Sequence, residues 1–81
     1  MFYTYILESA SHPKQRYIGY TSDLKARLLA HNEGKCLHTA KYRPWRIKMF
    51  IALEKEELAM NFESYLKSGS GHAFAKRHFG I

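Results

Sequence analysis

The chain has 81 residues, and its 13 Lys and Arg against 7 Asp and Glu give a formal net charge of +6. That length leaves room for one domain over residues 1–81, and an apolar share of 46% excludes a disordered chain. The positive charge favours a polyanionic partner such as nucleic acid, although solubility alone would also explain it.

Cysteine content and hydropathy indicate the cellular environment. The single cysteine, Cys36, cannot form an internal disulfide, which favours a reducing compartment. No stretch approaches the roughly 18 apolar residues that a membrane span needs. The first ten residues lack the basic and apolar regions of a signal peptide. We therefore expect a soluble, cytoplasmic protein without membrane contact.

The first part of the chain predicts a β-hairpin. FYTYILE (2–8) and RYIGYT (16–21) are rich in aromatic and β-branched residues, which is typical of strands. Residues 9–15 between them contain Ser, His and Pro and predict a short loop, so the strands should pair antiparallel. Gly19 either weakens the second strand or allows another backbone or a ligand to approach it closely.

A helix and a loop should follow the hairpin. Ser22 or Asp23 can cap a helix that begins at Leu24, and Gly34 is suited to the position just beyond its end. Residues 35–44 show no clear period and predict a basic loop.

The second half predicts one strand and two helices. Residues 45–53 alternate as a strand does, and residues 55–69 form an amphipathic pattern. Its apolar stripe should contain Leu58, Phe62, Tyr65 and Leu66. Gly69 and Gly71 should then interrupt the chain before a short last helix over 72–79. The expected class is α/β, more narrowly α+β: one three-stranded antiparallel sheet flanked by helices in the order β-β-α-β-α-α.

Two polar residues of the first predicted helix lie on one face. Arg27 and His31 are four positions apart and border the apolar stripe, so they should point along the seam between helix and sheet. Two interpretations are open. Either the Arg stem covers the edge of the core beside a half-buried His, or the pair faces a ligand.

Two tyrosines on neighbouring strands could face the same seam. Packing in the core or across the strands is the ordinary explanation for Tyr5 and Tyr17. The alternative is chemical, because positive charge from Arg27 and His31 would favour the phenolate of a nearby tyrosine.

The order of these motifs resembles the GIY-YIG nuclease family. The chain carries YTY at 3–5, YIG at 17–19, then Arg27 with His31, and later the basic segment KYRPW at 41–45 and a glutamate in a late helix. The resemblance covers nearly the whole chain and is strongest to the small stand-alone bacterial members.

The resemblance implies a metal-dependent DNA endonuclease, acting in DNA repair or recombination, with one Mg²⁺ or Mn²⁺ ion as cofactor. Tyr17 would be the general base, helped by His31, and Arg27 would stabilise charge on the phosphate. Tyr5 would position the phosphate or the water. Glu63 would be the metal ligand, although the helical period alone predicts an ordinary exposed acid there.

The remaining basic side chains would hold the DNA backbone without reading its sequence. They are Lys35, His38, Lys41, Arg43, Arg46, Lys67, Lys76 and Arg77. Trp45 could stack on a base, but its place at a strand start beside a proline favours packing in the core.

Two departures from the family pattern keep alternatives open. The first motif lacks its glycine, and no asparagine follows Asn61, whereas many family nucleases use a late one. Activity could therefore be weak or lost, which leaves a non-catalytic nucleic-acid-binding module of the same fold. A small protein-interaction domain is a third reading. The joint presence of all five candidate site residues speaks against both alternatives, although a module of this size could depend on a partner protein for targeting.

Overall fold

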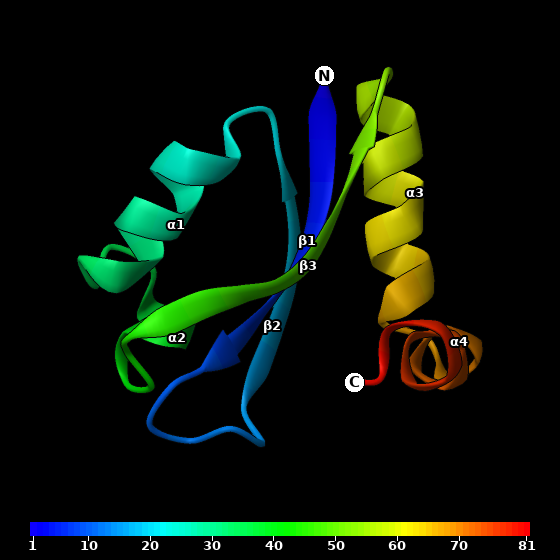
Figure 1. The fold of residues 1–81 in the computed structure, drawn as a ribbon. Helices are drawn as coiled ribbons and strands as arrows, with labels where there is room; N and C mark the ends of the chain where they lie inside the picture. Colours follow the sequence, from blue (N-terminus) through cyan, green and yellow to red (C-terminus); the bar gives the residue numbers. More distant parts are fainter.

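The computed structural model describes residues 1–81 and confirms the predicted α+β class (Figure 1). The strands are β1 (Phe2–Ser9), β2 (Arg16–Thr21) and β3 (Trp45–Leu53). The helices are α1 (Leu24–Asn32), α2 (Leu37–Ala40), α3 (Glu56–Leu66) and α4 (Gly69–Phe79). None of these helices has the length and apolar character that crossing a bilayer requires.

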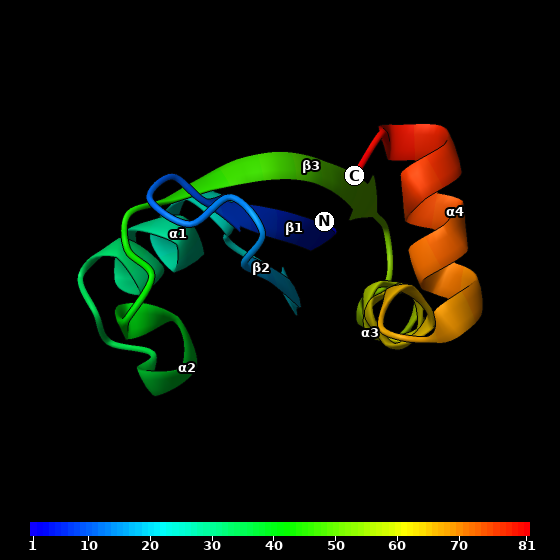
Figure 2. The same ribbon diagram turned by 90° about the horizontal axis from the view of Figure 1, so that it is seen from below.

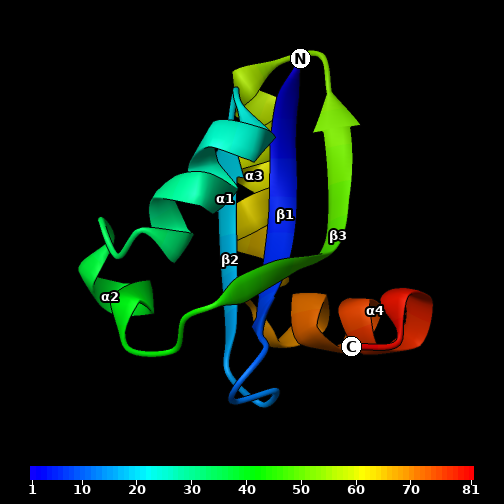
Figure 3. The same cartoon turned by 60° about the vertical axis from the view of Figure 1, so that its left-hand side comes forward.

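The sheet has the strand order β2-β1-β3, and both strand pairs are antiparallel. Tyr5 in the central strand lies opposite Gly19 of β2 and Phe50 of β3. Helix α1 lies in front of the sheet in Figure 3 and α3 lies behind it, so each covers a different face. Helix α4 runs across the end of α3 (Figures 1 and 2).

Successive side chains of β1 point to opposite faces of the sheet and pack into two separate apolar clusters. The cluster on the α1 side is formed by Tyr5, Leu7 and Trp45. The cluster on the side of α3 and α4 is formed by Ile6, Leu66 and Ala75. Trp45 is buried and its indole nitrogen donates to the Thr39 carbonyl at 2.7 Å, so the prediction that it packs in the core is confirmed.

The segment predicted as a loop over 35–44 contains the short helix α2, which the sequence analysis missed. Four residues are too few for an apolar period. The residue that anchors α2 is polar: Thr39 is buried, and its hydroxyl bonds to the ring of His31. Long-range hydrogen bonds therefore fix this helix.

The two glycines predicted to interrupt the chain lie in the first turn of α4 instead. The Ser68 hydroxyl oxygen accepts the N–H of Gly71 at 3.1 Å and so caps the helix. A Cβ at Gly71 would lie 1.8 Å from the carbonyl oxygen of Tyr65. Glycine at this position allows α4 to cross tightly over the end of α3.

The buried face of α3 also differs from the predicted stripe. Leu58 and Tyr65 are 49% and 40% exposed, whereas Ala59 and Leu66 are fully buried. The Thr4 hydroxyl of β1 donates to the Ala59 carbonyl at 2.8 Å. Helix α3 therefore approaches the sheet through a small residue. The predicted stripe is confirmed at Leu66 and Phe62, which pack in the cluster of Ile6, and is wrong at Leu58 and Tyr65.

Candidate active site

The phenol of Tyr5 occupies space that a glycine leaves open. Tyr5 and Tyr17 lie on paired strands with ring centroids 6.3 Å apart. A Cβ at Gly19 would come within 2.6 Å of the Tyr5 phenol oxygen and 3.0 Å of the Tyr17 ring. The glycine of the YIG motif therefore allows a close approach, as the sequence predicts, but the approaching group is a side chain of the protein.

A buried polar chain of three residues, Tyr5, His31 and Thr39, links β1, α1 and α2. The Tyr5 hydroxyl lies 3.1 Å from His31 Nε2, and His31 Nδ1 lies 2.8 Å from the Thr39 hydroxyl. Thr39 donates its own proton to the Cys36 carbonyl at 3.3 Å. The Thr39 oxygen must therefore accept from Nδ1–H, which leaves Nε2 to accept the proton of Tyr5.

Burial keeps both titratable members of this chain neutral. Desolvation, followed by the nearby Arg27 guanidinium, lowers the pKa of His31 from its ordinary value of 6.5. Desolvation raises the pKa of Tyr5 above 10.0, although Arg27 partly offsets that effect. The expectation that His31 contributes positive charge beside the tyrosines is therefore wrong, because its imidazole is uncharged at pH 7.

Arg27 and Tyr17 form the solvent-facing side of the same cluster. The guanidinium approaches the phenol oxygens of Tyr5 and Tyr17, and the pKa of Arg27 is raised mainly by its bond to Tyr5. Tyr17 is partly exposed, and its ring centroid lies 4.8 Å from that of His31. A hollow of about 60 Å³ beside this cluster is lined by Arg27, Ala30, His31, Lys35 and Cys36. A fixed cation and an accessible phenol thus face solvent above a neutral, fully bonded interior.

Two residues that position this cluster were not predicted, Asn32 and Thr39. The Asn32 amide donates to the carbonyl of Trp45 at 3.0 Å and accepts its N–H at 2.6 Å. These two hydrogen bonds fix the end of α1 against the start of β3. In the sequence, the only indication of a role for Asn32 is that a polar amide directly follows His31, and nothing indicates a role for Thr39.

Glu63, the predicted metal ligand, comes from the other side of the sheet. It lies on α3, where its side chain is only 18% exposed, so the prediction of an ordinary exposed acid from the helical period is wrong. Its carboxylate pairs with Lys67 Nζ at 3.0 Å and makes no hydrogen bond to the other four candidate residues. The structure thus brings four of the five together and places Glu63 apart from them.

The arrangement of acids restricts how a metal could be held. No three His, Cys, Asp or Glu side chains gather into a cage. Mg²⁺ is commonly held by one or two carboxylates, several waters and phosphate oxygens of the substrate, so a single carboxylate such as Glu63 fits that ion. It does not fit metals that need several protein ligands.

The predicted DNA-binding residues fall into separate groups. Those around α2, on the same side as Arg27, are Lys35, His38, Lys41 and Arg43. Three of the predicted residues have carboxylate partners: Lys35 pairs with Glu33 at 3.2 Å, Lys67 with Glu63, and Arg46 with the buried carboxylate of Glu8. Lys76 and Arg77 lie far from α2, on α4.

Glu8 is the centre of an ion cluster. Its carboxylate accepts from Arg46 and lies 3.8 Å from Arg16 and 3.7 Å from Lys48. The bond to Arg46, with the charges of Lys48 and Arg16, lowers the pKa of Glu8 below 4.5. Part of the positive charge of Arg46 is therefore neutralised within the protein.

Comparisons with known proteins agree with the motif pattern. The GIY-YIG catalytic domain matches residues 1–77. UPF0213 proteins of Streptococcus pyogenes serotype M5 (strain Manfredo) and serotype M2 (strain MGAS10270) are 41% identical over 66 residues, which cover 80% of this chain and 70% of theirs. A UPF0213 protein of serotype M3 (strain ATCC BAA-595 / MGAS315) is 39% identical over the same lengths. No solved structure matches the chain. With its tyrosine pair, its YIG glycine and a family match over nearly its whole length, the chain belongs to the GIY-YIG family, whose domains are generally nucleases.

Proposed function

We propose that this protein is a metal-dependent endonuclease that hydrolyses phosphodiester bonds in DNA, with a role in DNA repair or recombination. The observation that carries the proposal is that the exposed Arg27 and the partly exposed Tyr17 both adjoin His31 at the surface, directly above the buried polar chain. A cation and a phenol on either side of a neutral imidazole suit an anionic substrate that must gain charge as it reacts.

Arg27 is the group that would meet the phosphate. Its guanidinium is exposed and always charged, and the nearby phenol of Tyr5 is the main cause of its raised pKa. It can donate to two phosphate oxygens at once and so stabilise the charge that builds there during attack. A cation that is already charged and beside the site before the substrate arrives needs little reorganisation in the transition state.

Tyr17 is the phenol that can exchange a proton with the attacking water. It is partly exposed, whereas Tyr5 is 1% exposed and donates its proton to His31. The role of His31 is therefore to orient Tyr5 as a neutral acceptor. Tyr5 in turn presents its oxygen to Arg27 and fixes the guanidinium where the phosphate would lie.

Glu63 would hold the divalent ion, which when bound would polarise the phosphate and neutralise the leaving oxygen. Strand β2 is an edge strand with α1 against one face and α3 against the other (Figure 2). To meet both groups, a phosphate would have to lie along that edge, with Tyr17 on one face and Glu63 on the other. Lys67 would have to release the carboxylate first.

The ion pair between Lys67 and Glu63 favours a second candidate function, a nucleic-acid-binding module without catalysis. Lys67 neutralises the only carboxylate offered to a metal, and no asparagine follows Asn61. Such a module would keep the exposed cations and bind DNA through phosphate contacts alone.

Nicking of supercoiled plasmid in Mg²⁺ or Mn²⁺ separates the two candidates. We expect the wild-type protein to nick and Glu63→Gln to nick at least about 100-fold more slowly, because the ion loses its protein ligand. Glu57→Gln, an exposed acid on the same helix, is the matched control and should nick normally. Equal nicking by wild type and Glu63→Gln would reject the role of Glu63. No nicking by any of the three, with a salt-dependent gel shift retained, would reject the nuclease in favour of the binding module.

A further inference from the structure

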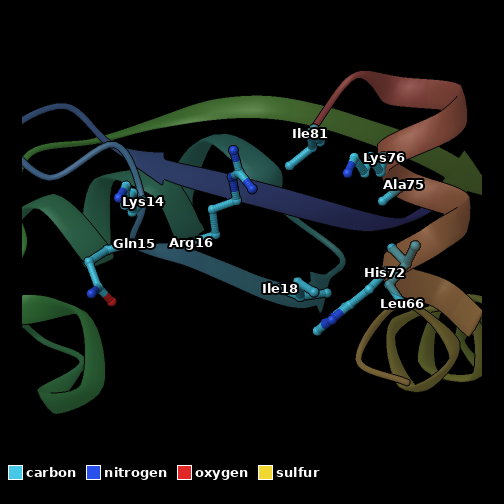
Figure 4. Close-up of a pocket in the computed structure, with 9 residues that line it drawn as sticks. All are labelled: Lys14, Gln15, Arg16, Ile18, Leu66, His72, Ala75, Lys76 and Ile81. Atoms are coloured by element: carbon cyan, nitrogen blue, oxygen red, sulfur yellow. The ribbon is translucent and has the colours of Figure 1, made fainter. Parts of the chain in front are cut away.

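A second hollow, shown in Figure 4, is lined by Arg16 and Ile18 of β2, which alternate with Tyr17 and so point to the opposite face of the strand. It has a volume of about 470 Å³ and lies between β2 and α4. Its floor is apolar and is formed by Ile18, Leu66 and Ala75. This volume falls in the range of about 300–1,000 Å³ that is typical of small-ligand sites. Sequence analysis gave no indication of this cavity, hereafter the β2 cavity.

The rim of the β2 cavity is cationic. Lys14 of the hairpin loop and Arg16 at the start of β2 border it on one side, and His72 and Lys76 border it from α4. No Asp or Glu lines it. The carboxylate nearest to Arg16 is Glu8, and it is shared with two further cations, which leaves an excess of two positive charges in that ion cluster. The cavity therefore combines an apolar floor with a positively charged entrance.

We propose that the β2 cavity binds one unpaired nucleotide of a DNA strand. Its phosphate would contact Arg16 and Lys76, and Lys14 would add positive charge at the far end of the rim. Its base would lie on Ile18 and the other apolar floor residues, with the flat ring of His72 beside it. An acidic peptide or a free phosphate would satisfy the rim but leave the apolar floor unused.

The position of the cavity relates it to the proposed nuclease site. Arg16, Tyr17 and Ile18 are consecutive in β2, and alternate residues of a strand point to opposite faces. The cavity and the cluster of Tyr17 and Arg27 thus lie on two sides of one edge strand. A strand of DNA crossing that edge could place its reacting phosphate at Arg27 and a neighbouring nucleotide in the cavity.

This placement, which rests on the proposed function, defines the class of substrate. A base within an intact duplex is stacked and paired, so it cannot enter a cavity unless it is flipped out. The preferred substrates would then be single-stranded DNA, flaps, overhangs and sites with an unpaired nucleotide.

Titration with thymidine 5′-monophosphate, followed by NMR in the absence of metal, tests the cavity directly. We expect the amide signals of Ile18, His72 and Ala75 to shift, and Lys76→Glu to weaken binding about tenfold because one charged phosphate contact is lost. Lys25→Glu makes the same charge change on α1, away from the cavity, and should leave the affinity within about twofold. Lys14→Glu, in the hairpin loop, serves as a second test variant if Lys76→Glu unfolds.

Three results would overturn the proposal: no shift at millimolar nucleotide, equal weakening by Lys76→Glu and Lys25→Glu, or inorganic phosphate shifting the same amides with equal affinity. The titration contains neither metal nor a bond to cleave, so it is independent of the nuclease test. A protein that binds the nucleotide but fails to nick plasmid rejects the proposed function alone. One that nicks but does not bind the nucleotide rejects the cavity alone.

Discussion

The two faces of the sheet hold their functional side chains in different ways. Facing α1, Tyr5 and His31 are buried and bonded to each other and to Thr39, so their geometry is fixed by short contacts on three elements. Facing α3, Glu63 pairs with a single lysine whose side chain is 53% exposed. The α1 face is preorganised, so substitutions that change side-chain shape should destabilise it. On the α3 face, Glu63 has to exchange Lys67 for a metal ion, so substitutions that change charge should have the main effect there.

The largest effect should follow from filling the space beside Tyr5. Gly19→Ala would put a methyl group 2.6 Å from a buried phenol oxygen, and we expect a loss of about 3 kcal/mol in the free energy of unfolding, the upper end for overpacking. Gly69→Ala is the control, because a Cβ there meets no atom within 4 Å. Urea denaturation of both variants measures the difference. Similar small changes in both would mean that the phenol of Tyr5 is free to move.

Removing one hydroxyl at a time separates structure from activity on the α1 face. Tyr5→Phe leaves the buried Nε2 of His31 without its donor, and we expect a loss of about 1–2 kcal/mol in stability. Tyr17→Phe removes a partly exposed hydroxyl, so stability should hardly change while nicking falls. Thermal unfolding and plasmid nicking on the same preparations test this contrast, and the reverse pattern would contradict the assignment of Tyr17 as the proton acceptor.

As the pH falls, the stabilising contribution of His31 on the α1 face should be lost before that of the ion cluster around Glu8. The folded pKa of His31 is below its ordinary 6.5, so below that pH the unfolded chain binds more protons and stability falls as pH falls. The pKa of Glu8 is also lowered, but from 4.5, so its contribution is lost only in more acidic solution. Denaturation at pH 7.5 and pH 5.5 should show the first loss. His31→Gln should abolish it, and the exposed control His38→Gln should retain it.

The smallest effect is expected on the α3 face. Lys67→Met removes the partner of Glu63, and an exposed ion pair contributes about 0.2–1 kcal/mol, so Mn²⁺ binding should tighten by about fivefold at most. Calorimetric titration with Mn²⁺, without DNA, measures this change independently of catalysis. Lys55→Met, at the other end of α3, is the control. Weaker binding in Lys67→Met would mean that the lysine supports the site instead of competing with the ion.

Local patterns were sufficient to predict the strands and the first helix. Alternating aromatic and β-branched residues located β2 and β3 to the residue, and β1 to within one residue. Asp23 caps α1 through a bond to the Ala26 N–H at 3.0 Å, and Gly34 has a φ of 77°, as a glycine beyond a helix end should. These features depend on neighbours in the sequence, so one sequence reveals them.

The features that were missed depend on residues far apart in the chain. The partial burial of Glu63, one turn after Ala59, accompanies the approach of α3 to the sheet at that small residue, which a search for large apolar residues overlooks. Helix α2 depends on the buried bond between Thr39 and His31, and the lowered pKa of His31 follows from its burial and from the charge of Arg27. The β2 cavity requires α4 to fold back toward the hairpin.

The two hydrogen bonds between Asn32 and Trp45 have a consequence for where the sequence of this protein can change without disturbing the fold. The side-chain amide of Asn32 makes two hydrogen bonds to the backbone of Trp45, so the two ends of the segment 33–44 are held together whatever residues lie between them. Within this segment Thr39 bonds to His31, and Tyr42 packs against the cluster of Tyr5 while its carbonyl accepts from the Ser9 hydroxyl at 2.7 Å. Insertions or exchanges at its other positions would alter the basic surface around α2 while the strands stay in register, which makes this segment the natural place for the surface charge to vary on an unchanged sheet.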